Sequence, residues 1–332
     1  MHTPSCGILL PETEIFDSYY GGAIARWVQE VYSLTDSLDI TIYGRIKKNS
    51  LTLHQGVKIS TASNFLISVI RKVPFIRRGL KYIYCATFYK KIKNREIIEI
   101  HNVPDYVLIL RFYGYKGKII LHMHNDYLRN YTTAYLNNLS EKLDKLLVCS
   151  NFLNETIKRS SRLLSKSVVI YNGFDPNKFY HQKLVNSDQQ SIGFVGRIDK
   201  NKGLHFLMSV YREIIKIKPG ISLKIVGSSG FGFGGSKYEL SQRSRANEIN
   251  GKEKGSITFY GYMHNDQLVN FYNSIDLLCS FSLKSEAFGM NLIECLACGT
   301  PVLANDIGGV NEANYNSLYN DPVIRLCWSL QN

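Results

Sequence analysis

The feature that most constrains the fold is a repeated alternation between short, continuously apolar β-rich runs and longer amphipathic segments. The strand candidates in the first half are CGILL, DITIY, IIEIH, YVLIL, KIILHMH and KLLVCS, and those in the second half are SIGFVG, SLKIVG, SITFYG, DLLCSF and PVLAN. Helix-like segments such as GGAIARWVQEVYSL, GLHFLMSVYREIIKI, NDQLVNFYNSI and NLIECLA lie between them. Strands that are apolar on both faces are typical of parallel sheets covered by helices. The alternation therefore predicts an α/β protein built from doubly wound units.

The chain is long enough for two such units. It has 332 residues, which suits two domains of ordinary size. A more polar stretch, DPNKFYHQKLVNSDQQS, interrupts the alternation, and we interpret it as a link between domains over residues 1–180 and 191–332. Ligands of open α/β sheets gather at the carboxyl ends of the strands, so the loops after the strands should carry the chemistry.

Several classes of protein do not fit the composition. No apolar run approaches the ~18 residues that span a bilayer, and the N-terminus has no basic region before its short apolar run, so no signal peptide is expected. Seven cysteines without a disulfide-like spacing fit a reducing cytoplasm. We interpret the lone C-x-x-C of Cys295 and Cys298 as two core thiols rather than a zinc site, and no metal is expected.

The net charge of +13 is concentrated in one segment. No Asp or Glu lies between Ile40 and Arg95, and this stretch holds thirteen basic residues: Arg45, Lys47, Lys48, Lys58, Arg71, Lys72, Arg77, Arg78, Lys81, Lys90, Lys91, Lys93 and Arg95. They alternate with apolar and aromatic residues, which favours contact with anionic lipid headgroups. A solvated basic face is the plainer alternative. A nucleic-acid patch is a third, but no recognisable nucleic-acid module accompanies it.

Two loops in the second half could bind a sugar nucleotide. In FVGRIDKNKG, Arg197 and Lys202 lie beside a helix start, where side-chain charge and helix dipole both favour a diphosphate. An ordinary surface loop with two bases is the alternative. A nearby glycine loop, GSSGFGFGGSK, has its Ser236-Lys237 in the wrong order for an NTPase phosphate loop.

The second loop is SEAFGMNLIECLACGTP. Gly289 should break the chain before a helix that Gly299 ends, leaving backbone N–H groups around Phe288, Gly289, Met290 and Asn291 for an anion. Glu294, in the first turns, could accept two ribose hydroxyls, and Glu286 would lie near the transferred sugar. A dipole-favoured helix acid would explain Glu294 alone, but not Glu286 or the glycine.

These residues resemble a known family. Glu286 and Glu294 match the E-x7-E motif of retaining glycosyltransferases of the large family numbered four, which have the GT-B fold. Further segments occur in the family's order: GGAIARWV, IEIHN, ILHMHNDY, VCSNFLNETI, VIYNGFDPNKF, FVGRIDKNKG, LKIVGSSG, ITFYGYM and GTPVLANDIGGVNE. The resemblance covers residues from about Ile8 to Glu312.

The resemblance implies two Rossmann-like domains facing each other across a cleft, and it implies roles for residues. Arg197 and Lys202 would hold the diphosphate, Glu294 the ribose, and Glu286 with the backbone from Phe288 to Asn291 the donor sugar. Gly21 and Gly22 would let the first domain's backbone approach the donor. His124 would lie at the reacting centre, with His122 as its rival and His101 equally explained as structural. Asn125 and Asp126 would border the acceptor. Arg197, Lys202, Glu286 and His124 are thus the expected catalytic residues.

The implied activity is transfer of a hexose or N-acetylhexosamine with retained configuration. The first half resembles bacterial enzymes of lipopolysaccharide core and surface-polysaccharide synthesis, which favours UDP-GlcNAc as donor, a glycan or glycolipid acceptor, and a cytoplasmic location on the inner face of the inner membrane. No cofactor beyond the nucleotide sugar is expected, and no D-x-D metal site is placed for the diphosphate.

A sugar-nucleotide epimerase and a binding or scaffold homologue without turnover remain alternatives. The family usually continues for several elements after GGVNE, whereas ANYNSLYNDPVIRLCWSLQN follows here; lack of a returning helix would loosen domain closure.

Overall fold

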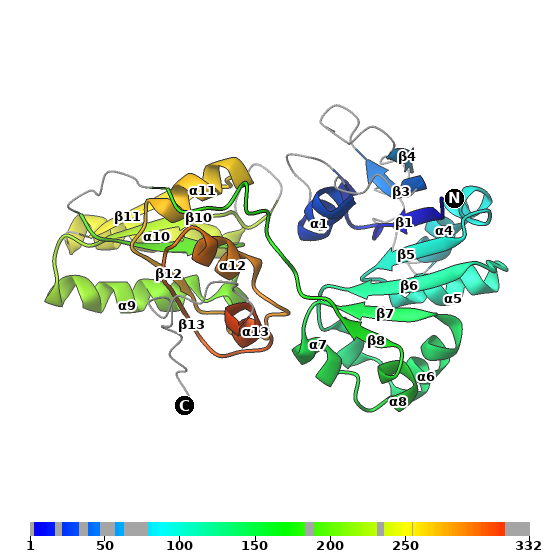
Figure 1. Ribbon diagram of the computed structural model, residues 1–332. Coiled ribbons are helices and arrows are strands. Elements are labelled where there is room, and N and C mark those ends of the chain that lie inside the picture. The colour runs from blue at the N-terminus through cyan, green and yellow to red at the C-terminus, as the bar shows by residue number, and fades with distance from the viewer. Residues whose placement is uncertain are drawn as a thin grey trace. The chain divides into compact units, whose positions relative to one another are not determined.

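The computed structural model describes residues 3–16, 22–32, 39–46, 57–62, 79–182, 189–230, 236–253 and 255–315. The chain divides into two compact units, Met1–Ile170 and Tyr171–Asn332 (Figure 1). Each unit contains one parallel sheet with helices packed on it, so the α/β class inferred from the alternation is confirmed. The polar stretch 175–191 lies in the second unit, and residues 183–188 of it are outside the described ranges.

The first unit is built on an eight-stranded parallel sheet in the order β2-β3-β1-β5-β6-β7-β8, with β4 paired to β3. The strands are β1 (Ser5–Leu9), β2 (Ile15–Phe16), β3 (Asp39–Ile46), β4 (Lys58–Thr61), β5 (Ile97–His101), β6 (Lys118–Met123), β7 (Lys145–Val148) and β8 (Ser167–Val169). The chain leaves β1 toward β3 on one side and returns to β5 on the other. The strand order therefore reverses between β1 and β5, and this is the point at which open α/β sheets bind ligands.

Helices flank this sheet: α1 (Ala23–Tyr32), α4 (Leu80–Ile92), α5 (Pro104–Phe112), the 3-10 turn η2 (Tyr127–Asn130), α6 (Thr133–Lys142), α7 (Asn151–Glu155) and α8 (Ser161–Leu164). The hydroxyls of Thr132, Ser150 and Ser160 cap the starts of α6, α7 and α8 by accepting backbone N–H bonds. Ile8, Ile40 and Ile42 from the strands and Ala25 and Val28 from α1 form a buried cluster. This packing fixes α1 against the sheet.

One predicted strand is wrong. YVLIL lies in helix α5, which begins with Pro104 and carries Asp105 in its first turn. A proline at the first helical position and an acid beside it are helix-start signals. A short apolar run fits a buried strand or a buried helix equally well, and these flanking signals should have decided between them.

The second unit contains a five-stranded parallel sheet in the order β11-β10-β9-β12-β13. Its strands are β9 (Ser191–Val195), β10 (Ser222–Val226), β11 (Ser256–Gly261), β12 (Leu277–Ser280) and β13 (Val302–Ala304). Its helices are the 3-10 turn η3 (Lys200–Lys202), α9 (Leu204–Ile217), α10 (Lys237–Lys252), α11 (Asn265–Asn273), α12 (Met290–Ala297) and α13 (Val310–Tyr315). Here the strand order reverses between β9 and β12, so the loops after these two strands flank the expected ligand site.

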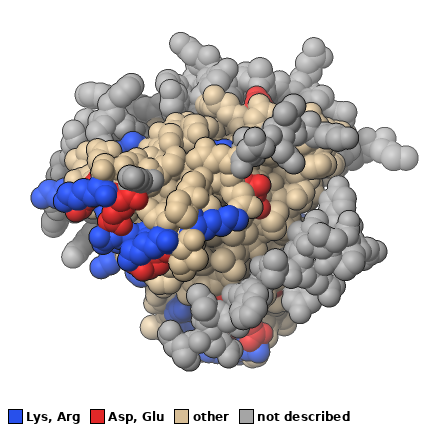
Figure 2. Space-filling model, turned by 90° about the vertical axis from the view of Figure 1, so that its left-hand side faces the viewer, with Lys and Arg blue, Asp and Glu red and all other residues tan. Residues whose placement is uncertain are grey.

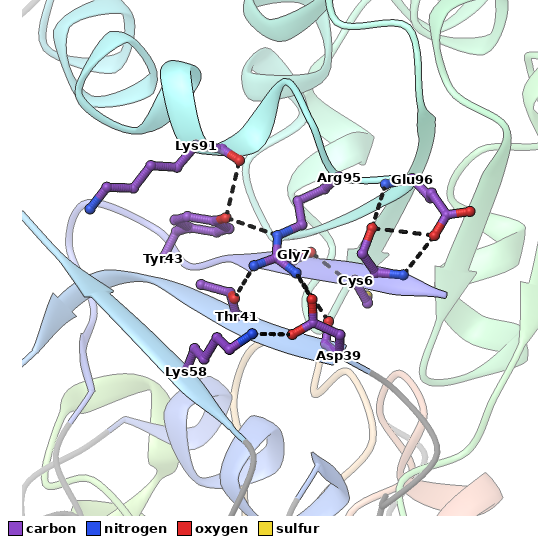
Figure 3. Close-up of polar contacts among 10 residues, drawn as sticks. Cys6, Gly7, Asp39, Thr41, Tyr43, Lys58, Lys91, Arg95 and Glu96 are labelled. Atoms are coloured by element: carbon purple, nitrogen blue, oxygen red, sulfur yellow. Dashed lines mark hydrogen bonds and ion pairs between the residues drawn. The ribbon is translucent and has the colours of Figure 1, made fainter. Parts of the chain in front are cut away.

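Several residues of the basic segment make contacts inside the first unit. Five of its described members donate to other residues of that unit: Arg45, Lys58, Lys81, Lys91 and Arg95. Figure 3 shows the largest of these groups, in which Arg95 donates to Asp39 at 2.7 Å and to the Thr41 hydroxyl at 2.5 Å, while Lys58 reaches Asp39 at 2.9 Å. These contacts join β3, β4 and the start of β5. These contacts give several of the bases a structural role. Six other bases of the segment lie outside the described residues: Lys47, Lys48, Arg71, Lys72, Arg77 and Arg78.

Elsewhere, acids and bases lie together. Figure 2 shows one face on which Lys and Arg side chains adjoin Asp and Glu side chains. In the second unit, Arg212 pairs with Glu253 and Lys216 with Glu213 on the surface of α9. Among the described residues, no helix is both long and apolar enough to cross a bilayer. Cys295 and Cys298 are buried, at 0% and 1% exposure, as expected for core thiols.

Candidate functional site

The loop after β9 brings Arg197 to the carboxyl edge of the second sheet. The backbone there is tightly packed, because a Cβ on Gly227 would lie 1.9 Å from the carbonyl oxygen of Gly196, and Gly227 has a φ of 135°. Arg197 is 66% exposed and donates from Nε to Asp199 at 2.6 Å. Asp199 also accepts the backbone N–H of Asn201 at 2.8 Å, which starts η3. The guanidinium is therefore held at the edge of the sheet but remains accessible to an anion.

The turn that carries Lys202 is locked onto the loop after β12. Gly203 ends η3 with a φ of 69°, and a Cβ there would lie 1.9 Å from the carbonyl oxygen of Phe281. The backbone N–H of Leu283 donates to the carbonyl of Asn201 at 2.6 Å. Only glycine permits this approach, so the Lys-Gly pair fixes where the ammonium group of Lys202 lies.

Lys202 and Glu286 form a direct ion pair, and their side chains are 29% and 26% exposed. The same carboxylate oxygen of Glu286 accepts the Ser282 hydroxyl at 3.1 Å. The backbone of Glu286 pairs with Gly308 in an isolated parallel bridge. A Cβ on Gly308 would lie 2.3 Å from the Glu286 carbonyl oxygen. The structure thus brings together two predicted site residues that are 84 positions apart.

Helix α12 begins at Met290, directly after Gly289, whose φ of 100° only glycine adopts readily. The Asn291 side chain donates to the carbonyl of Val195 at 2.9 Å, which ties the helix start to the end of β9. Phe288 is 2% exposed and its ring faces that of Tyr171 at 5.9 Å. Phe288 therefore anchors the loop. A Cβ on Gly289 would lie 4.0 Å from Cγ of Glu286, so the residue before α12 lies close to that side chain.

Glu294, the predicted ribose ligand, is largely enclosed by its own unit. It lies in the second turn of α12, is 7% exposed, and accepts the Tyr272 hydroxyl at 3.0 Å. Burial, followed by the charge of Glu294, raises the pKa of Tyr272 well above its ordinary value, so this tyrosine stays a donor. Its hydrogen bond orients the Glu294 carboxylate, and a ribose hydroxyl would add to that bond.

In the first unit the predicted histidines form one cluster. His101 and His122 are adjacent in the β5–β6 register, and His124 follows the end of β6. Nδ1 of His101 lies 2.9 Å from Nε2 of His124, and Nδ1 of His122 lies 3.0 Å from Glu99. Trp27 of α1 covers all three, with ring centroids 4.6–5.6 Å away. His101 and His122 are buried, whereas His124 remains partly exposed.

At the start of α1, Gly22 lies against a carboxylate of its own unit. Gly21 lies outside the described residues. A Cβ on Gly22 would lie 2.2 Å from the Glu14 carboxylate, which also accepts the Ala25 N–H at 3.2 Å. Burial raises the pKa of Glu14, while the N–H groups of Gly22 and Ala25 oppose this shift. The approach of a donor to Gly22 stays a prediction.

A cavity of about 380 Å³ lies at the strand-order reversal of the first sheet. It is lined by the loops after β1 and β5, by η2 and by α4, through Glu12, Thr13, Lys81, Asn102, Val103, Pro104, Tyr127, Asn130 and Tyr131. Asn102 has a φ of 58° and accepts the His124 backbone N–H at 2.7 Å. Asn102 therefore lines the cavity and also binds the backbone of the histidine cluster. The predicted acceptor residues Asn125 and Asp126 precede η2 and do not line it.

Sequence reasoning missed several residues of these sites. Glu99 had a visible signal, since a glutamate two positions before His101 in the apolar run IIEIH must lie on the same strand face as that histidine. Trp27 had none beyond its place in an amphipathic helix. Gly308 stood in DIGGVNE, but its contact with Glu286 depends on the tertiary fold.

Comparisons with known proteins agree with this geometry. Residues 176–317 match the family model described as Glycosyl transferases group 1. The structure is similar to Anabaena Alr3699/HepE in complex with UDP and glucose, with a TM-score of 0.69 at 18% identity over 92% of this chain and 82% of that one. It is also similar to a sucrose-phosphate synthase from Thermosynechococcus elongatus, with a TM-score of 0.72 at 17% identity over 93% and 83%. The chain has the GT-B fold.

Curated relatives of this GT-B chain include the Salmonella typhimurium lipopolysaccharide 1,2-N-acetylglucosaminetransferase, 29% identical over 65% of this chain and 56% of that protein. The phosphatidyl-myo-inositol mannosyltransferase of Mycolicibacterium smegmatis is 24% identical over 64% and 54%. The matched region thus spans little more than half the length of these relatives.

Proposed function

We propose that the chain is a glycosyltransferase whose second unit binds a nucleoside diphosphate sugar at the strand-order reversal between β9 and β12. The observation that carries this proposal is the contact between Lys202 and Glu286, which joins the loops after both strands. Arg197 and the start of α12 lie at the same edge. The match of residues 176–317 to a glycosyltransferase family model supports the proposal independently.

In this proposal the donor replaces contacts that the free protein makes with itself. Lys202 and Arg197 now face carboxylates, Glu286 and Asp199, and each can exchange its partner for a phosphate oxygen. Glu286 is then released to accept hydroxyls of the donor sugar, and Glu294 accepts those of the ribose. The N–H groups at the start of α12 add a fixed positive dipole toward the phosphates.

Catalysis then follows from where charge develops. The bond between the anomeric carbon and the diphosphate breaks, the acceptor oxygen bonds to that carbon, and its proton leaves with the departing phosphate. Negative charge grows on the diphosphate, so Arg197, Lys202 and the α12 start stabilise the transition state more than the bound donor. We propose retained configuration, which means that the acceptor attacks from the face that the diphosphate leaves.

The first unit is proposed to bind the acceptor. The cavity beside Asn102 is lined by two tyrosines, two asparagines and Lys81, which pairs with Asp105, and this mixture suits sugar hydroxyls and rings. The Salmonella relative's name favours N-acetylglucosamine as the transferred sugar and lipopolysaccharide as the acceptor class. Contact with an anionic membrane surface through the basic segment is part of this proposal.

The decisive experiment screens UDP-, GDP- and ADP-sugars by thermal shift, because a ligand that binds only the folded state raises the melting temperature. We expect one base to stabilise the wild-type chain clearly, and a chain with both Arg197 and Lys202 changed to Ala to respond far less. Lys200→Ala, on the same 3-10 turn, is the matched control. Equal stabilisation of all three chains would contradict the donor site.

Transfer is then tested with the selected donor and lipopolysaccharide core acceptors. Formation of a glycosylated acceptor with an anomeric proton of retained configuration supports the proposal. A new sugar nucleotide formed without acceptor would indicate an epimerase instead.

A further inference from the structure

The cavity of the first unit contains a carboxylate that the proposed transfer does not use. Glu12 follows β1 and is one of the residues that line this cavity of about 380 Å³. Its side chain is half-buried. A volume of this order is typical of sites for small ligands, in which a few fixed polar groups decide which ligand binds. The contacts of Glu12 therefore bear on the class of acceptor that the cavity takes.

Glu12 is held in place by the hydroxyl of Tyr106. This hydroxyl accepts the backbone N–H of Glu12 at 3.1 Å and donates to Oε2 of its carboxylate at 2.6 Å. Tyr106 lies in the first turn of α5 and is 0% exposed. Burial, followed by the charge of Glu12, raises the pKa of Tyr106 well above its ordinary value, so this hydroxyl stays a donor. Arg45, itself 6% exposed, donates to the Glu12 carbonyl at 3.2 Å. The carboxylate is thus oriented before a ligand arrives.

The Glu12 carboxylate keeps capacity for further hydrogen bonds. Within the described part of the chain, Tyr106 is the one side chain that donates to it, and that bond goes to Oε2. A carboxylate has about four lone-pair sites, so Oε1 can accept hydroxyl groups. The charge of Glu12 also acts on Lys81, which lines the same cavity. Burial lowers the pKa of Lys81, but Asp105, with a smaller contribution from Glu12, outweighs burial and raises it.

The cation of the cavity already has a partner. Lys81 pairs with Asp105, whose other oxygen accepts the Tyr135 hydroxyl at 2.5 Å. Two carboxylates, those of Glu12 and Asp105, thus stand against one ammonium group. An exchange of partner like that proposed for Lys202 would leave both carboxylates beside the incoming phosphate. Like charges brought together cost free energy of binding, so these described groups favour an uncharged ligand.

We propose that Glu12 is a specificity-determining residue that binds hydroxyls of an uncharged acceptor sugar. The hydroxyls of that sugar donate to Oε1 of Glu12, while the amides of Asn102 and Asn130 offer further donors and acceptors. The rings of Tyr127 and Tyr131 line the same cavity and suit the apolar face of a sugar. The word acceptor rests on the proposed function, but the binding of a neutral sugar by this cavity does not.

The first test uses the wild-type chain with a series of monodeoxy acceptors, each lacking one hydroxyl of the terminal sugar. Apart from the reacting hydroxyl, we expect one or two positions at which the loss lowers kcat/KM roughly ten- to a hundred-fold, because a hydrogen bond to a charged group is then missing. Equal use of all the other deoxy acceptors overturns the proposal. The test needs no variant, so it decides even if a change at Glu12 unfolds the chain.

The second test compares Glu12→Gln with Glu141→Gln, the same substitution at an exposed site on α6. Glutamine still accepts the Tyr106 hydroxyl but has no charge. In Glu12→Gln we expect kcat/KM for the parent acceptor to fall roughly ten- to a hundred-fold with donor KM unchanged. The sensitive deoxy acceptor should lose far less, because its missing hydroxyl no longer has a carboxylate to bind. Equal losses for the parent and deoxy acceptors make Glu12 merely structural and overturn the proposal. Glu141→Gln should change none of these values.

The third test measures binding without donor, by saturation-transfer NMR of the intact chain with methyl hexosides and with hexose 6-phosphates. We expect the wild-type chain to bind the neutral glycosides at least roughly ten-fold more tightly, and Glu12→Gln to narrow that ratio. Tighter binding of the sugar phosphates, lost in Lys81→Ala, overturns the proposal in favour of an anionic acceptor.

The same data separate this proposal from the proposed function. Binding of neutral sugars that depends on Glu12, without transfer from any nucleotide sugar, supports the role of Glu12 and refutes the proposed function. Transfer that is unchanged in Glu12→Gln supports the proposed function and overturns the role of Glu12.

Discussion

The two units hold their polar groups in opposite ways. In the second unit, Lys202 and Glu286 lie on loops, remain 29% and 26% exposed, and neutralise each other. In the first unit, Glu99, His101 and His122 lie on adjacent strands and are buried, at 5%, 0% and 1% exposure. The charged groups of the second unit are thus accessible to a ligand, whereas those of the first unit are buried.

The difference fits the proposed function. A charged donor has to enter and leave, so its receptor groups need partners that a phosphate or hydroxyl can replace at low cost in free energy. Buried polar groups, in contrast, cannot exchange their partners for water, so loss of one partner costs free energy of folding. We expect substitution of the exposed charged side chains in the second unit to act mainly on function, and substitution of the buried polar groups in the first unit to act on stability as well.

The largest expected effect tests the second unit. Lys202→Ala removes a cation from the place where the departing diphosphate gains charge, so turnover should fall roughly 10²- to 10³-fold, as for loss of one oxyanion donor. Donor affinity should weaken less, because the ground state develops less charge. Steady-state kinetics with saturating donor separate kcat from KM, and Lys200→Ala is the control. Unchanged turnover in Lys202→Ala would refute the catalytic assignment.

The next effect concerns the backbone under Glu286. Gly308 has a φ of 69° and lies where a Cβ would meet the Glu286 carbonyl at 2.3 Å. Gly308→Ala should therefore lower the free energy of unfolding by roughly 2–3 kcal/mol, through left-handed strain and displacement of the Glu286 backbone. Urea denaturation measures this loss.

Gly251→Ala provides the contrast, because this helical glycine has open space around it. It should raise stability by up to about 1 kcal/mol. Equal effects at the two glycines would mean that the contact between residues 286 and 308 does not shape the site.

The sequence predicted the exposed site better than the buried one, for a physical reason. Arg197, Lys202, Gly289 and Glu286 lie in loops after strands, where local pattern and strand ends decide position. Lys202 and Glu286 were expected at one site, and the structure joins them directly. What sequence could not supply was their mutual neutralisation, because that depends on the approach of Gly203 to Phe281.

In the first unit, local pattern identified the histidines but not their organisation. The contacts among them depend on the β5–β6 register and on the packing of α1, which are tertiary facts. The error at YVLIL has the same origin, because periodicity alone cannot separate a buried helix from a buried strand. The expected contact of the basic segment with lipid does not account for Arg95 and Lys58, whose partner Asp39 lies just outside the acid-free stretch.

A third prediction concerns acid stability of the first unit. Burial, with a smaller effect of His122, lowers the pKa of His101, and burial with both neighbouring histidines lowers that of His124. As pH falls below the unfolded pKa of about 6.5, the unfolded chain binds protons that the folded chain refuses. Stability present above that pH is therefore lost on acidification, by about 1–2 kcal/mol between pH 6.5 and 5.5.

Fluorescence can follow this loss at the cluster itself. Trp27 packs on all three histidines, and the other tryptophan, Trp328, can be replaced by Phe so that Trp27 is the single reporter. His101→Phe should reduce the pH slope of the urea midpoint. If the urea midpoint does not change with pH in the parent chain, or changes equally in His101→Phe, the fold does not lower the pKa of these histidines.

The smallest expected effect completes the comparison. A double-mutant cycle on Lys202→Met and Glu286→Gln should give a coupling of no more than about 1 kcal/mol in the free energy of unfolding, because both side chains are partly exposed and water can replace either partner. The same cycle measured on turnover should give a large coupling, since both groups act on one bound donor. If the coupling in stability instead reached roughly 3 kcal/mol, as in buried pairs, donor binding would have to break a strong structural contact. The ion pair would then be part of the scaffold rather than an exchangeable receptor, and the contrast between the two units would fail.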